Sequence, residues 1–294
     1  MDTRKWEAML TAVELGSFTR AAQRLGVTQS GLTHMMNALE KETGFPLLFR
    51  DRSGVRLTAA GERLVPAIRE LIEASTHLDQ QIAAQAGRRQ GSIRVAAYSS
   101  VCMHWLPTIV QQFRWAWPDV SVDIRMGSVQ EVYRWLQEGT VDLSFASRQS
   151  QWRCDWAPLW DDPLMAILPP DYPTGGRDRF PVSEFAGKEF LMPSLGFDLD
   201  ILGVFEARNI RPAIRSNTAV EDAAILSMVE HGLGVSILSQ LVLQGRRDNV
   251  QALPLDPPAW RHMGVAIPSL EEAPPVIQEF IAYSKRIVGA LHGA

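Results

Sequence analysis

Four side chains with hydrogen-bonding groups lie close together near the N-terminus. They are Gln29, Ser30, Thr33 and His34. A glutamine amide can bond bidentately to the edge of adenine, and serine and threonine hydroxyls read several base edges. Short polar side chains at the start of a helix are what a helix-turn-helix presents to the major groove of DNA. Each residue alone also fits a solvated helix face, so the prediction of a base-reading surface rests on the whole set.

Basic residues near this segment supply a second requirement of such a surface, namely contacts to phosphate. Arg20 precedes the polar set, and Arg50, Arg52 and Arg56 follow it. Phosphate contacts hold a protein in register on the duplex without reading its sequence. Residues 1–94 carry 13 Lys+Arg against 10 Asp+Glu, whereas the remainder carries 16 against 23. This asymmetry favours a basic contact module joined to an acidic one.

Helical patterns position these side chains. The apolar spacing predicts helices over residues 3–15 and 18–25. Gly26 then permits a tight turn, and Thr28 can cap a third helix that carries the polar set, where Thr28 is also expected to contact DNA. Two short extended pieces follow on either side of a Ser-Gly turn pair, which predicts a hairpin or wing. Residues 1–58 are therefore expected to form an all-α helix-turn-helix with a wing.

A long helical segment is predicted from residue 59 to residue 87. One stripe of its side chains steps by four and three residues in turn, which is a heptad seam. The stripe comprises Leu64, Ile68, Leu71, Ser75, Leu78, Ile82 and Gln85. Because a lone helix of this length cannot bury such a stripe, we expect it to pair with the same helix of a second copy. Packing of the stripe against a later part of the same chain is the alternative.

Beyond a polar, glycine-flanked stretch at residues 87–91, strands alternate with helices. Strands are predicted at residues 93–97, 120–126, 141–146, 164–168, 190–192, 235–238, 250–253 and 263–267. Helices are predicted at residues 103–115, 129–138, 199–208, 220–230 and 275–291. This alternation predicts an α/β fold in which helices cover a parallel sheet.

Composition and motifs exclude several classes of function. Hydrophobic residues make up 46% of the chain and charged residues 21%, and no apolar run is long enough to span a bilayer. The N-terminus has no secretory signal pattern, so a cytoplasmic location is expected. Phosphate loops, GxSxG, HExxH and CxxC are absent, so we expect no enzyme activity, no cofactor and no metal site. A solute-binding protein of a transporter would match only the later part of the chain.

The two cysteines, Cys102 and Cys154, leave two alternatives open. Cys102 lies near a predicted helix start, where a thiolate is favoured, so a redox switch that joins the two residues is one alternative. Two unreactive thiols are the other. Two cysteines are too few for a disulfide framework or a zinc site.

The run GSFTRAAQRLGVTQSGLTHMMNALEKETGFPLLFRDRSGVRLTAAG, residues 16–61, resembles the DNA-binding signature of LysR-type transcriptional regulators. The similarity extends over essentially the whole chain. It implies a winged helix-turn-helix that binds promoter DNA, a dimerising linker helix, and a two-lobed effector-binding domain like a periplasmic binding protein. It also implies a small-molecule effector and a homodimer or homotetramer. His34 stands where the family commonly has arginine, so its largely neutral imidazole is a weaker phosphate anchor.

The resemblance places the effector-binding domain at residues 92–294. One lobe would comprise residues 92–165 and 266–294 and the other residues 166–265, with the chain crossing at these boundaries. Open parallel sheets bind ligands beyond the carboxyl ends of their strands, where helices begin. The residues that resemble the family's effector contacts are Ser99, Ser100, Ser128, Phe145, Ser147, Ser194, Asn217 and Thr218. Their hydroxyls would suit a small carboxylate or another anion, although simple helix capping is the alternative for each serine.

Overall fold

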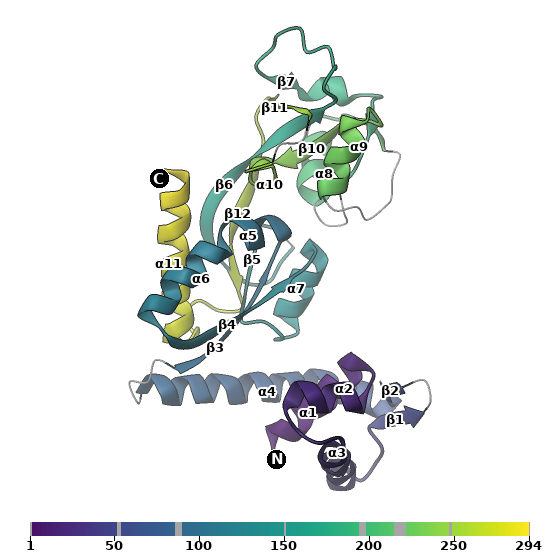
Figure 1. Ribbon diagram of the computed structural model, residues 1–294, viewed down its shortest axis with the longest axis vertical. Coiled ribbons are helices and arrows are strands. Elements are labelled where there is room, and N and C mark those ends of the chain that lie inside the picture. Colours follow the sequence, from purple (N-terminus) through teal and green to yellow (C-terminus); the bar gives the residue numbers. More distant parts are fainter. Residues whose placement is uncertain are drawn as a thin grey trace. The chain divides into compact units, whose positions relative to one another are not determined.

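The computed structural model describes residues 2–51, 54–85, 90–149, 151–193, 198–214, 222–246 and 249–293 (Figure 1). Four residues that the sequence singled out lie outside these ranges, namely Arg52, Ser194, Asn217 and Thr218. The chain divides into two units, Met1–Gly87 and Arg88–Ala294. Each unit has its own hydrophobic core.

Three helices form the core of the first unit, and all three were predicted. They are α1 (Thr3–Leu15), α2 (Phe18–Leu25) and α3 (Gln29–Thr43). Gly26 ends α2 with a left-handed φ of 67°, a conformation that a side chain would strain. Thr28 Oγ1 then caps α3 by accepting a hydrogen bond from a backbone amide of its first turn at 3.0 Å. The side chains buried between the helices include Trp6, Met9, Leu32, Met36 and Leu39.

A two-stranded hairpin completes the predicted wing. Its strands, β1 (Leu48–Asp51) and β2 (Gly54–Leu57), pair antiparallel. A Cβ atom at Gly54 would lie 2.6 Å from the carbonyl oxygen of Gly16, and φ at Gly54 is 117°, so only glycine suits this position. The Val55 amide donates to the same carbonyl at 3.1 Å. The hairpin is thereby fixed to the end of α1, and the winged helix-turn-helix prediction is confirmed.

The long helix α4 (Ala59–Gln85) follows the hairpin. In the first half of its seam, Leu64, Ile68 and Leu71 pack against the core of the helix-turn-helix, and Ile68 is only 4% exposed. In the second half, Leu78 and Ile82 are 59% and 57% exposed. The two halves of the seam therefore differ. The first half belongs to the core of its own unit, and the second half leaves large apolar side chains exposed.

Five strands form the sheet of the first lobe of the second unit, in the order β4-β3-β5-β12-β6. Their bounds are Gln90–Ala97 (β3), Asp119–Met126 (β4), Leu143–Ser147 (β5), Asp155–Leu168 (β6) and Trp260–Ile267 (β12). The helices are α5 (Ser99–His104), α6 (Leu106–Ala116), α7 (Val129–Gln137) and α11 (Pro275–His292). Figure 1 shows α6 and α11 on one side of the sheet and α7 on the other.

The second lobe is built on the far half of β6. There β6 pairs antiparallel with β10 (Ser236–Ser239) and β11 (Gln251–Asp256), and β7 (Phe180–Pro181) pairs with β11. The short strands β8 (Glu189–Phe190) and β9 (Ala213–Ile214) form a separate parallel pair. The helices are α8 (Asp198–Glu206), α9 (Asp222–Glu230), α10 (Gln240–Leu243) and a 3-10 turn, Val182–Phe185. Phenylalanine rings in edge-to-face contact fill the core of this lobe.

The prediction of a parallel sheet is wrong for the strands that join the lobes. β3 is parallel to β4 and β5, but β12 is antiparallel to β5 and to β6. The reason is topological, since the chain leaves the first lobe along β6 and returns along β12. The prediction also gave β6 only residues 164–168. The first part of β6 was missed because it contains Pro158 and Pro163. Proline cannot donate a hydrogen bond to a strand ladder, so it argues against a strand in the sequence.

The second crossing point and one helix also differ from the predictions. Trp260 pairs with Pro163 and Ile267 with Asp155, so the whole of β12 lies in the first sheet. The second crossing therefore precedes Trp260 and does not fall at residues 265–266. The helix predicted at residues 103–115 is two helices, α5 and α6.

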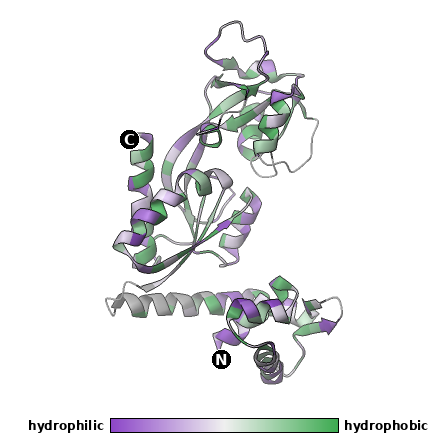
Figure 2. Ribbon diagram, viewed as in Figure 1, coloured by the Kyte–Doolittle hydropathy of each residue, from purple (hydrophilic) through white to green (hydrophobic). Residues whose placement is uncertain are grey.

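Hydrophobic residues of the terminal helix follow the expected periodicity. Figure 2 shows hydrophobic and hydrophilic patches alternating along α11, and its buried side chains include Val276, Ile277, Phe280, Ile281, Ile287 and Val288. This is the pattern of a helix with one face against a core. Among the helices that the structure describes, none combines the length and apolar character needed to cross a membrane.

Candidate DNA interface and ligand site

The first turns of α3 present an exposed polar face. Gln29, Ser30 and His34 are exposed, and Thr33 is half-buried. The Thr33 hydroxyl donates to the Gln29 carbonyl at 2.9 Å, and Ser30 Oγ lies 3.2 Å from Thr28 Oγ1. Within the described part of the chain, the Gln29 amide and the His34 imidazole make no hydrogen bond. Both groups are therefore available to a partner.

Arg50 is engaged inside the unit. Its guanidinium donates to Glu40 Oε2 and Asn37 Oδ1, each at 2.7 Å, and its Cζ lies 5.2 Å from the centre of the Phe18 ring. These contacts join the hairpin to α2 and α3. Arg50 thus fixes the orientation of the wing, and any phosphate contact would compete with this network.

Arg56 and Arg20 have fewer partners. Arg56 Nη2 lies 2.9 Å from Asp51 Oδ2, and both side chains are at least half exposed. Arg20 donates to the carbonyl oxygen of Leu15. Exposed ion pairs of this kind contribute little to stability, so Arg56 can exchange its carboxylate for a phosphate at small cost.

The serines predicted to bind an effector mostly have partners within the protein. The Ser128 hydroxyl donates to Glu131 Oε2 at 2.8 Å in a capping box at the start of α7. Hydrogen bonds from the Ser128 backbone and side chain lower the pKa of Glu131. Ser100 is buried and accepts a hydrogen bond from Arg261 Nη2 at 3.3 Å. Ser99 is half-buried, and its hydroxyl makes no hydrogen bond to another described residue.

The two predicted residues on β5 are both buried. The Phe145 ring lies in the core of the first lobe, 6.4 Å from the Phe280 ring, so its side chain does not face a ligand. Ser147 Oγ accepts a hydrogen bond from Gln149 Nε2 at 3.0 Å, and the Ser147 amide donates to the Tyr98 hydroxyl at 3.3 Å. Burial raises the pKa of Tyr98 well above its usual range, which keeps the phenol neutral.

A buried ion pair that the sequence did not single out lies beside these groups. Arg261 on β12 and Asp162 on β6 have no exposed side-chain surface, and Arg261 Nη2 lies 2.6 Å from Asp162 Oδ2. Asp162 Oδ1 accepts a hydrogen bond from the backbone amide of Leu241 on α10 at 3.0 Å. The only signal in the sequence was a lone arginine beside the apolar run of β12. Its partner was not readable, because that depends on the register of two distant strands.

Asp200 on α8 connects the second lobe to the first. Its Oδ1 accepts a hydrogen bond from Gln149 Nε2 at 3.3 Å. Its Oδ2 is buried and makes no hydrogen bond of normal geometry with a described residue, although the Ser147 hydroxyl is close enough to influence its ionisation. Burial raises the pKa of Asp200, and nearby Arg261 partly offsets this effect. The lobes thus meet through polar and ionisable groups.

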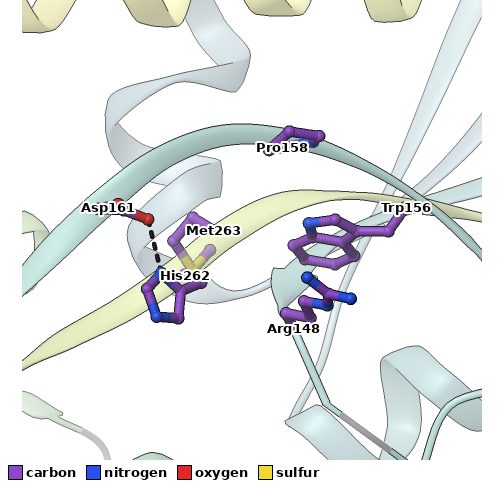
Figure 3. A pocket seen from close by; sticks show the side chains of 6 residues that line it. All are labelled: Arg148, Trp156, Pro158, Asp161, His262 and Met263. Carbon is purple, nitrogen blue, oxygen red and sulfur yellow. Dashed lines mark hydrogen bonds and ion pairs between the residues drawn. The ribbon is translucent and has the colours of Figure 1, made fainter.

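A pocket opens beside this lobe contact. Successive residues of a strand point to opposite faces, so His262 lies on the face of β12 opposite to Arg261. The pocket is lined by Arg148, Trp156, Pro158, Asp161, His262 and Met263 (Figure 3). His262 Nδ1 lies 2.6 Å from Asp161 Oδ1, and both side chains are largely exposed. None of these six residues was among the predicted effector contacts.

Both cysteines are free thiols. Burial raises the pKa of Cys102 to about 11, and burial together with the charge of Asp155 raises the pKa of Cys154. The thiolate that the redox alternative requires is therefore not favoured at Cys102. Because the thiolate is the reactive form, the raised pKa values favour the alternative of two unreactive thiols.

Two family models match the chain. The model for bacterial regulatory helix-turn-helix proteins of the lysR family matches residues 3–62, and the model for the LysR substrate binding domain matches residues 86–288. The chain belongs to the LysR family. It is a LysR-type transcriptional regulator and not an enzyme, with a DNA-binding helix-turn-helix in its first unit and an effector-binding domain in its second.

Several relatives match this LysR-type regulator over nearly its whole length. The HTH-type transcriptional regulator YvbU of Bacillus subtilis is 26% identical, with 99% of this chain and 100% of the relative covered. The structure of full-length OxyR from Pseudomonas aeruginosa has a TM-score of 0.74 at 23% identity, with 97% and 98% covered. Full-length CbnR in complex with its target DNA has a TM-score of 0.55 at 22% identity, with 98% and 100% covered. These similarities confirm the predicted fold.

Proposed function

We propose that this regulator binds double-stranded promoter DNA through the start of α3, with Gln29, Ser30, Thr33 and His34 at the base edges. The observation that carries this proposal is the exposed face of α3, whose amide and imidazole have no partner among the described residues. Leu32 and the Thr28 cap hold the same helix in place. The complex of CbnR with its target DNA supports this function by analogy. Arg20, Arg52 and Arg56 are proposed to contact phosphates, and Arg50 to orient the wing and approach the backbone from there.

A gel-shift assay with the region upstream of its own gene tests this proposal. We expect Gln29→Ala to weaken binding to the specific site by about 1–3 kcal/mol while binding to random DNA changes little. We expect Arg56→Gln to weaken both and to reduce the salt dependence by about one phosphate contact. Gln244→Ala, which removes an exposed amide from the second unit, is the control. If Gln29→Ala leaves the preference for the specific site unchanged, α3 is not the base-reading element.

Pairing of α4 with the α4 of a second copy would cover Leu78 and Ile82. This dimer would give the regulator two recognition helices, and association of two dimers would give a homotetramer. We expect Leu78→Lys with Ile82→Lys to produce a smaller particle in analytical ultracentrifugation and to weaken DNA binding. Ala74→Lys changes an exposed position outside the seam and is the control. A double variant that sediments like the unmodified protein would contradict pairing through this stripe.

The effector-binding domain is proposed to bind a small molecule, such as a carboxylate, between its lobes and to change DNA binding when it does so. Among the predicted contacts, Ser99 gives the best support for an effector site at this place. Its hydroxyl has no hydrogen-bond partner among the described residues, so it can donate to or accept from a ligand. Ser100, Ser128, Ser147 and the backbone at Phe145 would complete the wall of the first lobe, and the second lobe would contribute Ser194, Asn217 and Thr218. Since its DNA target lies there, the regulator is proposed to act in the cytoplasm.

A thermal-shift screen of small carboxylates would find candidate effectors. A true effector should also alter the gel shift. We expect Ser99→Ala to weaken its binding, whereas Ser269→Ala, in the loop before α11, should not. An effector whose affinity is indifferent to Ser99 would contradict this part of the proposal.

A further inference from the structure

The pocket of Figure 3 is built around an irregularity in the strands that join the lobes. The pairing of β6 with β12 shifts between Met263 and Gly264. A Cβ atom at Gly264 would lie 2.5 Å from a ring carbon of Trp156, so the indole lies directly against the glycine backbone. A larger residue would displace the ring. Packing against Gly264 thus fixes the Trp156 ring, which forms one side of the pocket. Figure 3 shows Arg148 beside this ring.

The two oppositely charged side chains that line this pocket, Arg148 and Asp161, differ in their partners. The Asp161 carboxylate is bonded by His262. Arg148 is exposed, and among the described residues its guanidinium has neither an ion-pair partner nor a hydrogen-bond acceptor. Its position is nevertheless fixed at the backbone, because the Arg148 amide donates to the His262 carbonyl at 2.8 Å. Arginine stays charged at any physiological pH, so the pocket offers one permanent positive charge.

We propose that this pocket binds a small aromatic carboxylate, with its carboxylate paired to Arg148 and its ring against Trp156. A guanidinium matches a carboxylate bidentately, and an indole offers a flat surface for another ring. Pro158 and Met263 add apolar surface on the remaining sides. A cationic group beside Arg148 would be repelled, and a simple inorganic anion would gain nothing from the indole.

This inference rests on the proposed function, because it adds to the effector-binding domain a ligand position whose lining residues differ from the effector contacts proposed above. The position of the pocket allows a bound ligand to be sensed. Gln149, the neighbour of Arg148, donates to Asp200 of the second lobe. His262 is also close enough to Asp200 to influence that carboxyl group. A carboxylate at Arg148 therefore changes the electrostatic environment of the contact between the lobes, which couples binding to lobe arrangement.

Isothermal titration calorimetry of the full chain with three probes tests the inference. Phenylacetate has both the ring and the charge, phenylacetamide lacks the charge, and acetate lacks the ring. We expect phenylacetate to bind at least about tenfold more tightly than either of the others. Arg148→Gln should reduce the affinity for phenylacetate to that for phenylacetamide, and Trp156→Leu should reduce it about fivefold or more. Arg153→Gln, at an exposed arginine of the same lobe outside the pocket, should change it less than about twofold.

Three results would overturn the inference. They are equal affinities for phenylacetate and phenylacetamide, unchanged phenylacetate affinity in Arg148→Gln, and no binding of phenylacetate at millimolar concentration. None of these results touches the proposed function itself. If some other molecule alters the gel shift and binds equally well to Arg148→Gln, the regulator responds to an effector elsewhere and only the assignment of this pocket fails.

Discussion

Replacing Asp162 by asparagine removes the charge that faces Arg261 while keeping nearly the same shape. Both side chains are completely buried, and Arg261 Nη2 lies 2.6 Å from Asp162 Oδ2. The variant leaves a guanidinium in the interior without its carboxylate. The amide oxygen of asparagine can still accept the hydrogen bond from Leu241, but its NH2 group then faces Arg261 Nη2, so the variant loses both the charge and the hydrogen bond to the guanidinium.

Removing one partner of a buried ion pair costs about 3–5 kcal/mol, because the remaining charge has lost its solvation and its counter-ion. For a domain of this size, each kcal/mol lowers Tm by about 2–4 °C, so the expected decrease is about 6–20 °C. The adjacent residue provides a matched control. Asp161 pairs with His262 at the same distance of 2.6 Å, but their side chains are 66% and 63% exposed. Asp161→Asn should therefore cost less than about 1 kcal/mol.

Differential scanning calorimetry at neutral pH would measure both variants. A third variant that combines Asp162→Leu with Arg261→Met removes both charges and should recover most of the lost stability. If Asp162→Asn and Asp161→Asn lower Tm by similar amounts, the buried pair does not carry the energy assigned to it.

Three further perturbations have defined outcomes. Burial raises the pKa of Asp200 in the folded protein above its ordinary value of 3.8. The folded state is therefore favoured while this carboxyl group is protonated, and the stabilisation is lost as pH rises through the folded pKa. Tm should therefore fall more from about pH 4 to about pH 7 in the unmodified protein than in Asp200→Asn, and parallel pH profiles would contradict this. Cys102, with a pKa of about 11, should react with iodoacetamide at about pH 8 far more slowly than free cysteine does, and rapid stoichiometric labelling would argue for an activated thiolate. Gly264→Ala places a Cβ atom 2.5 Å from the Ala157 carbonyl oxygen and should cost about 1–3 kcal/mol by urea denaturation, whereas Gly203→Ala, which has open space, should be neutral or stabilising.

The local order of the helix-turn-helix was readable from the sequence. Thr28 caps α3, Gly26 takes the left-handed turn before it, and a Ser-Gly pair marks the hairpin. Each of these signals acts within a few residues of chain, where capping and backbone conformation decide the structure. The division of the chain into a helical N-terminal unit and an α/β unit was predicted for the same reason, because periodicity is a local property.

The sheet that joins the lobes was decided by tertiary structure. β12 lies between β5 and β6, two strands far from it in the chain, and its antiparallel direction follows from where the chain returns. The register of this pairing brings Arg261 to Asp162 on one face and His262 to Asp161 on the other. It also places Trp156 on Gly264.

By itself, the sequence determined the three helices of the first unit, the alternation of strands and helices in the second, and which polar residues occupy the start of α3. Only the folded chain decided that Asp162 is buried beside Arg261 while the adjacent residue, Asp161, is exposed to solvent. The physical reason is that alternate strand residues face opposite ways, so burial depends on what the other strands and lobes bring to each face.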